Sequence, residues 1–211
     1  TGRYKVGNRM FPCNNLNGHG NLDLAGALKV SCNVYFYDIF ARMMLKKGRK
    51  NQHKAYDEWQ EKVRKFGIGD TLGIDFPGES GYKLFTAADY TNTPLQMANI
   101  MAIIANRGYY IKPHLVKGIG DTKYIHPKYK EKHQVGIDAR HFESVIDGMQ
   151  DAVNAPWGTA TESRIPNILM CGKTGTVQNV HGKNHSVFIG FAPRDNPKIA
   201  IAVIVENGGY G

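Results

Sequence analysis

The strongest constraint on the fold lies near the C-terminal end of the chain, where three apolar segments follow one another. They cover residues 168 to 178, 186 to 192 and 198 to 205, and the third contains the uninterrupted run IAIAVIV. Runs of this length that are bounded by turn-forming residues are typical of buried strands. The sequence PRDNP joins the last two segments, and so short a connection predicts a hairpin. We therefore expect an antiparallel sheet here.

The preceding part of the chain carries mainly helical patterns. Thr93 is expected to cap one of these helices, with Gln96 three residues later and Pro94 in the first turn. Residues 67 to 93 have the composition of a loop, residues from 109 onward suggest an extended segment, and 119 to 136 are polar and irregular. Helical spacing of apolar residues covers 22 to 47, broken at the triplet SCN, and then 52 to 66, 93 to 108 and 138 to 154. Helices followed by strands with short links predict an α+β fold, with helices packed on an antiparallel sheet.

Length and composition narrow the function classes. A chain of 211 residues with 42% hydrophobic and 21% charged residues suits one soluble domain with a core of its own. No apolar run approaches the ~18 residues of a membrane span. The net charge of +9 is spread along the chain and comes without an RNP motif, zinc-finger spacing or basic heptads. Nucleic acid is therefore not expected as a partner.

The cysteines and histidines form no recognisable metal motif in the sequence. Cys13, Cys32 and Cys171 are widely spaced and include no CxxC pair, which argues against a zinc site or a thioredoxin motif. His181 and His185 flank Gly182 in a segment that has the composition of a loop. The sequence therefore predicts neither a metal nor a cofactor.

Residues 171 to 179 read CGKTGTVQN and raise two interpretations. A phosphate-binding loop requires GxxxxGK[ST], but its first position falls on Asn167, and strand rather than helix follows. A nucleotide site is therefore excluded. The second interpretation is the KTG box of penicillin-recognising serine acyltransferases, whose other motifs are SxxK and SxN.

The triplet SCN at 31 to 33 supplies an SxN motif, upstream of KTG as that order requires. Each motif alone has a simpler explanation, because KTGT suits a surface turn and SCN suits a helix N-cap. The two together, each at the boundary of a predicted element, favour the catalytic interpretation.

Each residue of the KTG segment has a chemical reason to be there. Lys173, on an edge strand lining a cleft, would provide a positive charge for a substrate carboxylate and for a proton relay. Thr174 and Thr176 would donate hydroxyl hydrogens to that carboxylate. Gly175 would let the substrate backbone lie against the strand. The backbone N–H of Thr176 would form half of an oxyanion hole.

The SxN segment would complete the site. Ser31 would pass a proton between a lysine and the leaving amine, and Asn33 would hydrogen-bond the substrate amide. Cys32, between them, is expected to face the core.

Five segments together resemble the transpeptidase domain of class B penicillin-binding proteins, most closely the elongation-type penicillin-binding proteins 2. They are SCNVYFYDIFARM, GIDFPGES, TPLQMANIMAIIANRGYYIKPHLV, GTATESRIPNILMCGKTGTVQN and HSVFIGFAPRDNPKIAIAVIVENGG. The resemblance implies a penicillin-binding/β-lactamase-like transpeptidase fold over residues 1 to 211. It implies a D,D-transpeptidase that cross-links peptidoglycan stem peptides at D-Ala-D-Ala through a serine acyl-enzyme, and that β-lactams inhibit. It also implies the periplasmic face of the inner membrane, a membrane anchor and partners in the elongation complex.

The sequence departs from that pattern in three places. Residues 1 to 30 contain no serine, so no SxxK precedes Ser31, and we expect the acylated serine to lie upstream of this chain. Ser80 and Lys83 do spell SxxK, but after SxN and in a turn-rich loop. FTAADYTN stands where the family has a Gly-rich stretch, so residues between Ser80 and Thr93 are expected to be missing or different. Because the chain stops at ENGGYG, where the family continues into a helix, we expect a partial domain, incomplete at both ends.

Two alternative functions stay open at this point. One is a non-catalytic penicillin-binding-like module, a pseudoenzyme that has lost its nucleophile. The other is a serine β-lactamase or a D,D-carboxypeptidase, since both use KTG.

Overall fold

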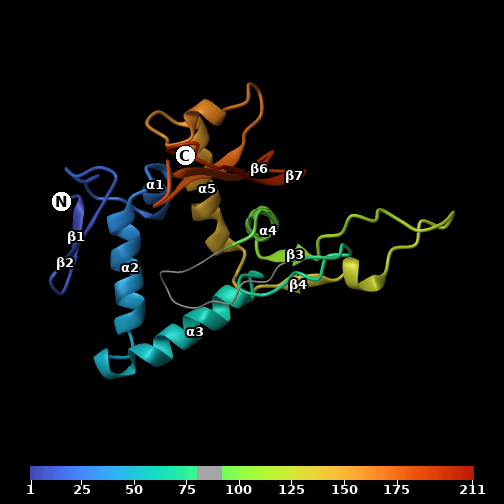
Figure 1. The fold of residues 1–211 in the computed structure, drawn as a ribbon, viewed down its shortest axis with the longest axis horizontal. Helices are drawn as coiled ribbons and strands as arrows, with labels where there is room; N and C mark the ends of the chain where they lie inside the picture. Colours follow the sequence, from blue (N-terminus) through green and yellow to red (C-terminus); the bar gives the residue numbers. More distant parts are fainter. Residues whose placement is uncertain (80–91) are drawn as a thin grey trace.

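The computed structural model describes residues 1–79 and 92–211. Its largest described sheet is three-stranded and antiparallel, in the order β5-β6-β7 (Figure 1). The strands are β5 (Cys171–Val177), β6 (His185–Ala192) and β7 (Ile199–Val205). Lys173 pairs with Ile189 across β5 and β6. The three predicted strands and the hairpin are confirmed, and β5 is an edge strand of this sheet.

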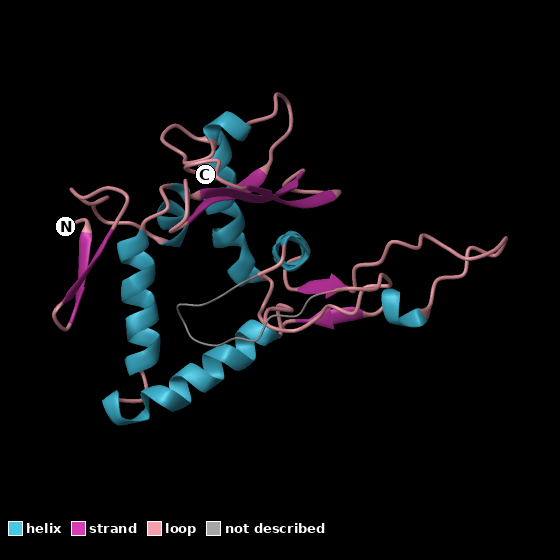
Figure 2. Ribbon diagram, in the orientation of Figure 1, coloured by secondary structure: helices cyan, strands magenta, loops and turns pink. Residues whose placement is uncertain are grey.

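Five α-helices occupy the described residues, close to the predicted positions (Figure 2). The predicted break at SCN is confirmed, because one helix ends just before Ser31 and the next begins at Asn33. The helices are α1 (Leu24–Lys29), α2 (Asn33–Leu45), α3 (Gln52–Arg64), α4 (Pro94–Ala105) and α5 (Arg140–Asn154).

The main core lies between α4, α5 and the sheet. Ile103 of α4 and Ile146 of α5 have no exposed surface, and Cys171 and Phe191 of the sheet lie in the same apolar cluster. Burying such side chains stabilises a fold by roughly 1.5–3 kcal/mol each. The expected arrangement of helices packed on an antiparallel sheet is confirmed.

The start of α4 follows from its sequence. The Thr93 hydroxyl accepts a hydrogen bond from the Gln96 N–H, and the Gln96 side chain accepts one from the Thr93 N–H. The buried Gln96 amide also donates to the Asp70 carbonyl over 2.8 Å. The predicted N-cap is confirmed. Through its bond to Asp70, Gln96 also connects the loop after α3 to the core.

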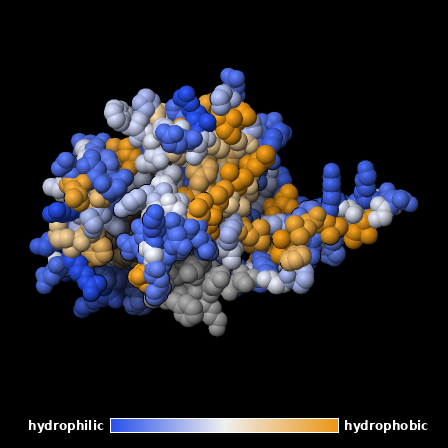
Figure 3. Space-filling view, turned by 45° about the horizontal axis from the view of Figure 1, so that its top comes forward, coloured by the Kyte–Doolittle hydropathy of each residue, from blue (hydrophilic) through white to orange (hydrophobic). Residues whose placement is uncertain are grey.

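Two small antiparallel ribbons complete the fold. One pairs β1 (Arg3–Val6) with β2 (Arg9–Pro12), and the other pairs β3 (Tyr109–Ile111) with β4 (Lys132–Gln134). The extended segment at 109 is confirmed, whereas the irregular structure expected over 119 to 136 is wrong for β4. Polar strands of three or four residues lack the alternation that identifies a strand in a sequence. The segment that joins β3 to β4 projects from the body, with hydrophobic and hydrophilic side chains along it (Figure 3).

Within residues 1–79 and 92–211, three short 3-10 turns lie between the larger elements, at Arg49–Asn51, Pro127–Tyr129 and Thr161–Ser163. None of the helices in the described part of the chain is long and apolar enough to cross a bilayer. Ser80 and Lys83 lie outside the described residues.

Candidate active site

Ser31 lies in the tight turn between α1 and α2. Its N–H donates to the Leu28 carbonyl over 3.2 Å, and the Cys32 N–H donates to the Ala27 carbonyl over 2.9 Å. The backbone φ of Ser31 is +54°, a left-handed conformation that costs a residue with a Cβ about 1 kcal/mol. Strained backbone of this kind is often found at functional sites.

Lys173 reaches this turn from β5. Its Nζ donates to the Ser31 Oγ over 2.8 Å and to the Thr174 carbonyl over 2.9 Å. The lysine side chain is half-buried, and burial lowers the pKa of its ammonium to about 8. The group is therefore mainly cationic at pH 7, yet it loses its proton within reach of neutral pH, which suits both charge recognition and proton transfer.

The other predicted site residues lie on the same two elements. Asn33 is exposed at the start of α2, and Thr174 and Gly175 are half-buried on β5. Thr176 is exposed, and its hydroxyl accepts a hydrogen bond from the Gly211 N–H over 3.2 Å. The structure thus brings Ser31 and Lys173 into direct contact and places Asn33 two residues further along the chain.

Gly175 is not demanded by the packing of its own chain. A Cβ built on this residue would meet only the Val187 Cβ, at an ordinary distance of 3.6 Å. A positive φ does not require glycine here either, since Gly175 is not among the left-handed residues. The absence of a side chain at Gly175 therefore leaves open space beside β5, which a bound molecule could occupy.

The two halves of the site are held by the end of α5 and the loop after it. Asn154 Nδ2 donates to the Met170 carbonyl over 2.8 Å, which fixes the approach to β5. The Thr159 N–H donates to the Lys29 carbonyl over 3.2 Å, which fixes the end of α1. Neither bond can be predicted from a local sequence pattern, because each joins residues far apart in the chain.

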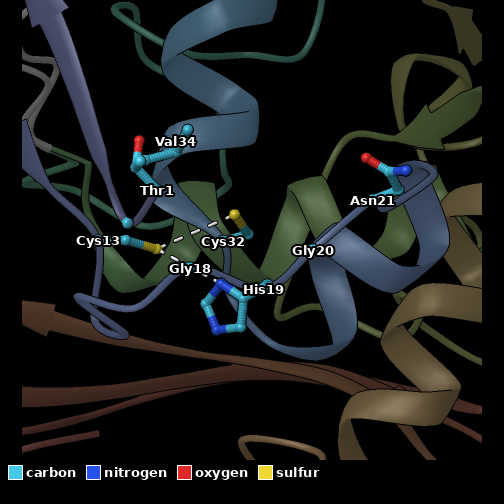
Figure 4. Close-up of a pocket in the computed structure, with 9 residues that line it drawn as sticks. Thr1, Cys13, Gly18, His19, Gly20, Asn21, Cys32 and Val34 are labelled. Carbon is cyan, nitrogen blue, oxygen red and sulfur yellow. Dashed lines mark hydrogen bonds between the residues drawn. The ribbon is translucent and has the colours of Figure 1, made fainter.

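A second cluster lies directly behind the SCN turn. Cys32 is buried, as expected, and its Sγ lies 3.9 Å from the Sγ of Cys13. The Cys13 Sγ also lies 3.7 Å from the His19 Nδ1, and the three ligand atoms lie within 4.8 Å of one another. They line a cavity of about 210 Å³, in which the two thiols and the imidazole converge (Figure 4).

The two distances from the Cys13 Sγ, 3.9 Å to the Cys32 Sγ and 3.7 Å to the His19 Nδ1, are close to those of a zinc site. Two thiolates on a tetrahedral Zn²⁺ lie about 3.8 Å apart, and a thiolate and an imidazole nitrogen about 3.6 Å apart, given the usual bond lengths. Burial opposes ionisation of Cys13, but backbone hydrogen bonds, from Val34 first, outweigh it and lower the pKa of that thiol. Burial and the neighbouring Cys13 raise the pKa of the Cys32 thiol, so without a cation only one of the two thiols is favoured to ionise. Three chain ligands leave a fourth position for water or another donor.

The sequence predicts no metal site, and the structure adds a candidate set of ligands to that prediction. Sequence spacing indicates only ligands that are close together in the chain, whereas the fold brings Cys13, just after β2, against the start of α2. Cys171 is no part of the cluster. It lies in the main core, where burial raises the pKa of its thiol to about 12.

The fold and the serine–lysine contact together define a class of domain. In this class, helices pack on an antiparallel sheet, and an edge strand that carries KTG meets a turn that carries SxN. Residues 2–211 match the family described as penicillin binding protein transpeptidase domain. The chain belongs to that family.

Several relatives within the family are peptidoglycan D,D-transpeptidases named MrdA. The peptidoglycan D,D-transpeptidase MrdA of Acinetobacter baumannii is 30% identical over 92% of this chain and 33% of its own length. A crystal structure of Pseudomonas aeruginosa PBP2 with WCK 5153 covers 100% of this chain and 49% of that one at 28% identity, with a TM-score of 0.78. The match to a complex of PBP2 and MreC from Helicobacter pylori covers 100% of this chain and 41% of the matched chain at 25% identity, with a TM-score of 0.75.

The chain spans about a third of the length of the curated relatives it matches. The matches confirm the predicted resemblance to elongation-type class B penicillin-binding proteins and the predicted fold class.

Proposed function

We propose that this chain is part of a peptidoglycan D,D-transpeptidase that cross-links stem peptides through a serine acyl-enzyme. The observation that carries the proposal is the hydrogen bond from Lys173 to Ser31, which joins the KTG and SxN motifs 142 positions apart. Family membership and the D,D-transpeptidase activity in the names of the relatives support the same reaction.

The reaction divides into two acyl transfers. In the first, a serine oxygen bonds to the penultimate D-Ala carbonyl carbon, the peptide C–N bond breaks, and the terminal D-Ala leaves with a proton on its nitrogen. In the second, the amine of another stem peptide attacks the ester and releases the serine. Because no serine precedes Ser31 in residues 1 to 30, we infer that the acylated serine belongs to an SxxK motif outside this chain.

The residues of this chain hold the substrate and move protons. Lys173 binds the terminal carboxylate with its positive charge, together with the hydroxyls of Thr174 and Thr176. The contact between Lys173 and the Ser31 hydroxyl forms a path along which a proton reaches the leaving amine. Asn33 orients the substrate amide, and the open space at Gly175 admits the peptide backbone.

We further propose that residues 1 to 211 form one partial transpeptidase domain on the periplasmic face of the bacterial inner membrane. The relatives are enzymes of cell-wall synthesis in the bacterial envelope. A membrane anchor, elongation-complex partners such as MreC, which is present in the H. pylori complex, and β-lactams as inhibitors all follow from the same assignment.

The competing functions predict different chemistry. A pseudoenzyme binds penicillin without acylation, and a β-lactamase hydrolyses it rapidly. The test is to express the protein with its natural flanking sequence, add fluorescent penicillin, and follow adduct formation and release. A stable adduct that depends on Lys173 supports the transpeptidase, whereas rapid turnover or no adduct in the folded protein argues against it.

A second function, metal binding, is favoured by the cluster behind the SCN turn. We propose that Cys13, His19 and Cys32 hold a soft divalent cation such as Zn²⁺ through two thiolates and one imidazole nitrogen. The sulfur–sulfur and sulfur–nitrogen distances carry this proposal. Bound there, the ion would fasten the N-terminal ribbon to the start of α2 and thereby hold the SCN turn.

A further inference from the structure

Helix α5 lies against both elements that carry the site. On one side, Val153 of α5 faces β5. A Cβ built on Gly172 of β5 would lie 3.1 Å from the Cγ2 of Val153. Met149 of α5 belongs to the same buried cluster as Cys171, the first residue of β5. On another side, Gly148 faces α1, which leads into Ser31. The separation between Ser31 and Lys173 therefore depends on how closely α1 and β5 rest on α5.

Gly148 allows an unusually close approach between α1 and α5. A Cβ at this position would lie 2.7 Å from the Ala25 carbonyl oxygen, 2.8 Å from the Leu28 Cβ and 2.9 Å from the Ala25 Cα. These atoms belong to the backbone or are fixed to it, so no flexible side chain can move aside. Glycine also weakens a helix interior relative to alanine, and Gly148 does not have a positive φ. The contact with α1 is therefore what calls for glycine here.

We propose that Gly148 is a positioning residue that sets the distance between the Ser31 hydroxyl and the Lys173 ammonium. The inference rests on the proposed function, because it assigns Gly148 a role in the same site. The physical link is short: Leu28 accepts the hydrogen bond from the Ser31 N–H over 3.2 Å. A shift of α1 at Leu28 therefore carries Ser31 with it.

The expected shift of α1 is large enough to weaken the hydrogen bond between Ser31 and Lys173. Moving the Leu28 Cβ from 2.8 Å to an ordinary carbon–carbon contact requires roughly 0.7 Å. The Ser31–Lys173 hydrogen bond measures 2.8 Å, and such bonds weaken beyond about 3.2 Å. A methyl group at position 148 would thus loosen the contact and admit water to Lys173, whose pKa is lowered by burial.

The experiment compares Gly148→Ala with a variant that disturbs the core elsewhere. Ile103→Val removes one methyl from a fully buried residue of α4 and is expected to lower the melting temperature without altering the contact between Gly148 and α1. The protein is expressed with its natural flanking sequence. The pKa of Lys173 is measured by pH-dependent amine labelling with mass spectrometry, and acylation is measured with fluorescent penicillin.

We expect Gly148→Ala to raise the pKa of Lys173 toward that of a free lysine and to slow acylation about 10- to 100-fold. Ile103→Val should change neither quantity. An unchanged pKa of Lys173 in folded Gly148→Ala, or the same rise in Ile103→Val, would overturn the positioning role. If Gly148→Ala fails to fold, Leu28→Ile tests the same contact, because it places a branch at the Cβ of Leu28 with no change in volume.

The two readouts separate this inference from the proposed function. If the wild-type protein forms no penicillin adduct, the proposed reaction is wrong, yet the labelling of Lys173 still decides whether Gly148 positions it. If acylation occurs normally in every variant and the pKa of Lys173 does not move, the reaction stands and the positioning role fails.

Discussion

The ammonium of Lys173 donates a hydrogen bond to the hydroxyl of Ser31 over 2.8 Å, although the two residues are 142 positions apart. One lies on an edge strand and the other in a strained turn between two helices. Because the lysine is half-buried, its pKa falls to about 8. The contact therefore joins a tunable positive charge to a hydroxyl that accepts and donates protons.

The first prediction concerns pH. Lys173 carries its charge below pH 8 and loses it above, so penicillin acylation should decline as the pH rises through about 8. Lys173→Arg keeps the charge at all accessible pH values and should remove this decline. Lys173→Met removes the charge and should lower the acylation rate at least about 100-fold.

Acylation rates of the wild type and of both variants, measured from pH 6 to 10, show whether Lys173 is the group that titrates. A wild-type profile that stays level through pH 8, or an identical alkaline decline in Lys173→Arg, would show that another group titrates. Circular dichroism at each pH controls for unfolding.

The second prediction separates the Ser31 hydroxyl from the Ser31 backbone. Ser31→Ala and Ser31→Gly both remove the hydroxyl, so both should slow acylation by about 100-fold if that group relays a proton. Only glycine relieves the strain of the +54° φ, so Ser31→Gly should be about 1 kcal/mol more stable than Ser31→Ala. Full activity in either variant would remove Ser31 from the reaction, whatever the stability.

The third prediction concerns the start of α4. Thr93→Ala removes the hydroxyl that accepts from the Gln96 N–H and should cost about 1 kcal/mol of unfolding free energy. Thr93→Ser retains the hydroxyl and should cost much less. Urea denaturation of both variants measures the difference, and equal losses would mean that the lost methyl group, not the cap, matters.

Much of the fold could be predicted because the patterns involved are local. The capping residues of α4 and the apolar run of β7 each predict their structure from a few neighbouring positions. The strands β1, β2 and β4 cannot be predicted in the same way, because each has only three or four residues, too few to establish a pattern, and each forms by pairing with a neighbour. Ser31 and Lys173 could be named from two short motifs, whereas their contact depends on how α5 packs against both.

The thiol and imidazole cluster cannot be predicted from the sequence in this way. Cys13, His19 and Cys32 are separated by unequal intervals, and nothing in those intervals indicates that the side chains converge. Their meeting depends on the β1–β2 ribbon returning the chain to the start of α2.

The fourth prediction concerns residues 1 to 211 alone. Without a serine in SxxK before the SxN triplet, this segment should not form a covalent adduct with labelled penicillin, whereas the protein with its upstream sequence should. Mass spectrometry of the penicillin-treated segment is the measurement, after its fold is verified by circular dichroism. An adduct on Ser80 would contradict the assigned order of motifs and make Ser80 the nucleophile.

The fifth prediction concerns the metal. Elemental analysis of the purified protein should find about one Zn²⁺ per chain, held by Cys13, His19 and Cys32, whose ligand atoms lie within 4.8 Å of one another. Cys13→Ser and His19→Ala should each lower the zinc content and the melting temperature, because binding to the folded state alone stabilises it by mass action. Cys171→Ala is the matched control, since that cysteine lies in the main core, and it should retain the metal. If Cys13→Ser and Cys171→Ala hold equal amounts of zinc, the ion binds elsewhere, and a strong chelator that leaves the wild-type melting temperature unchanged would show that no ion fastens the SCN turn.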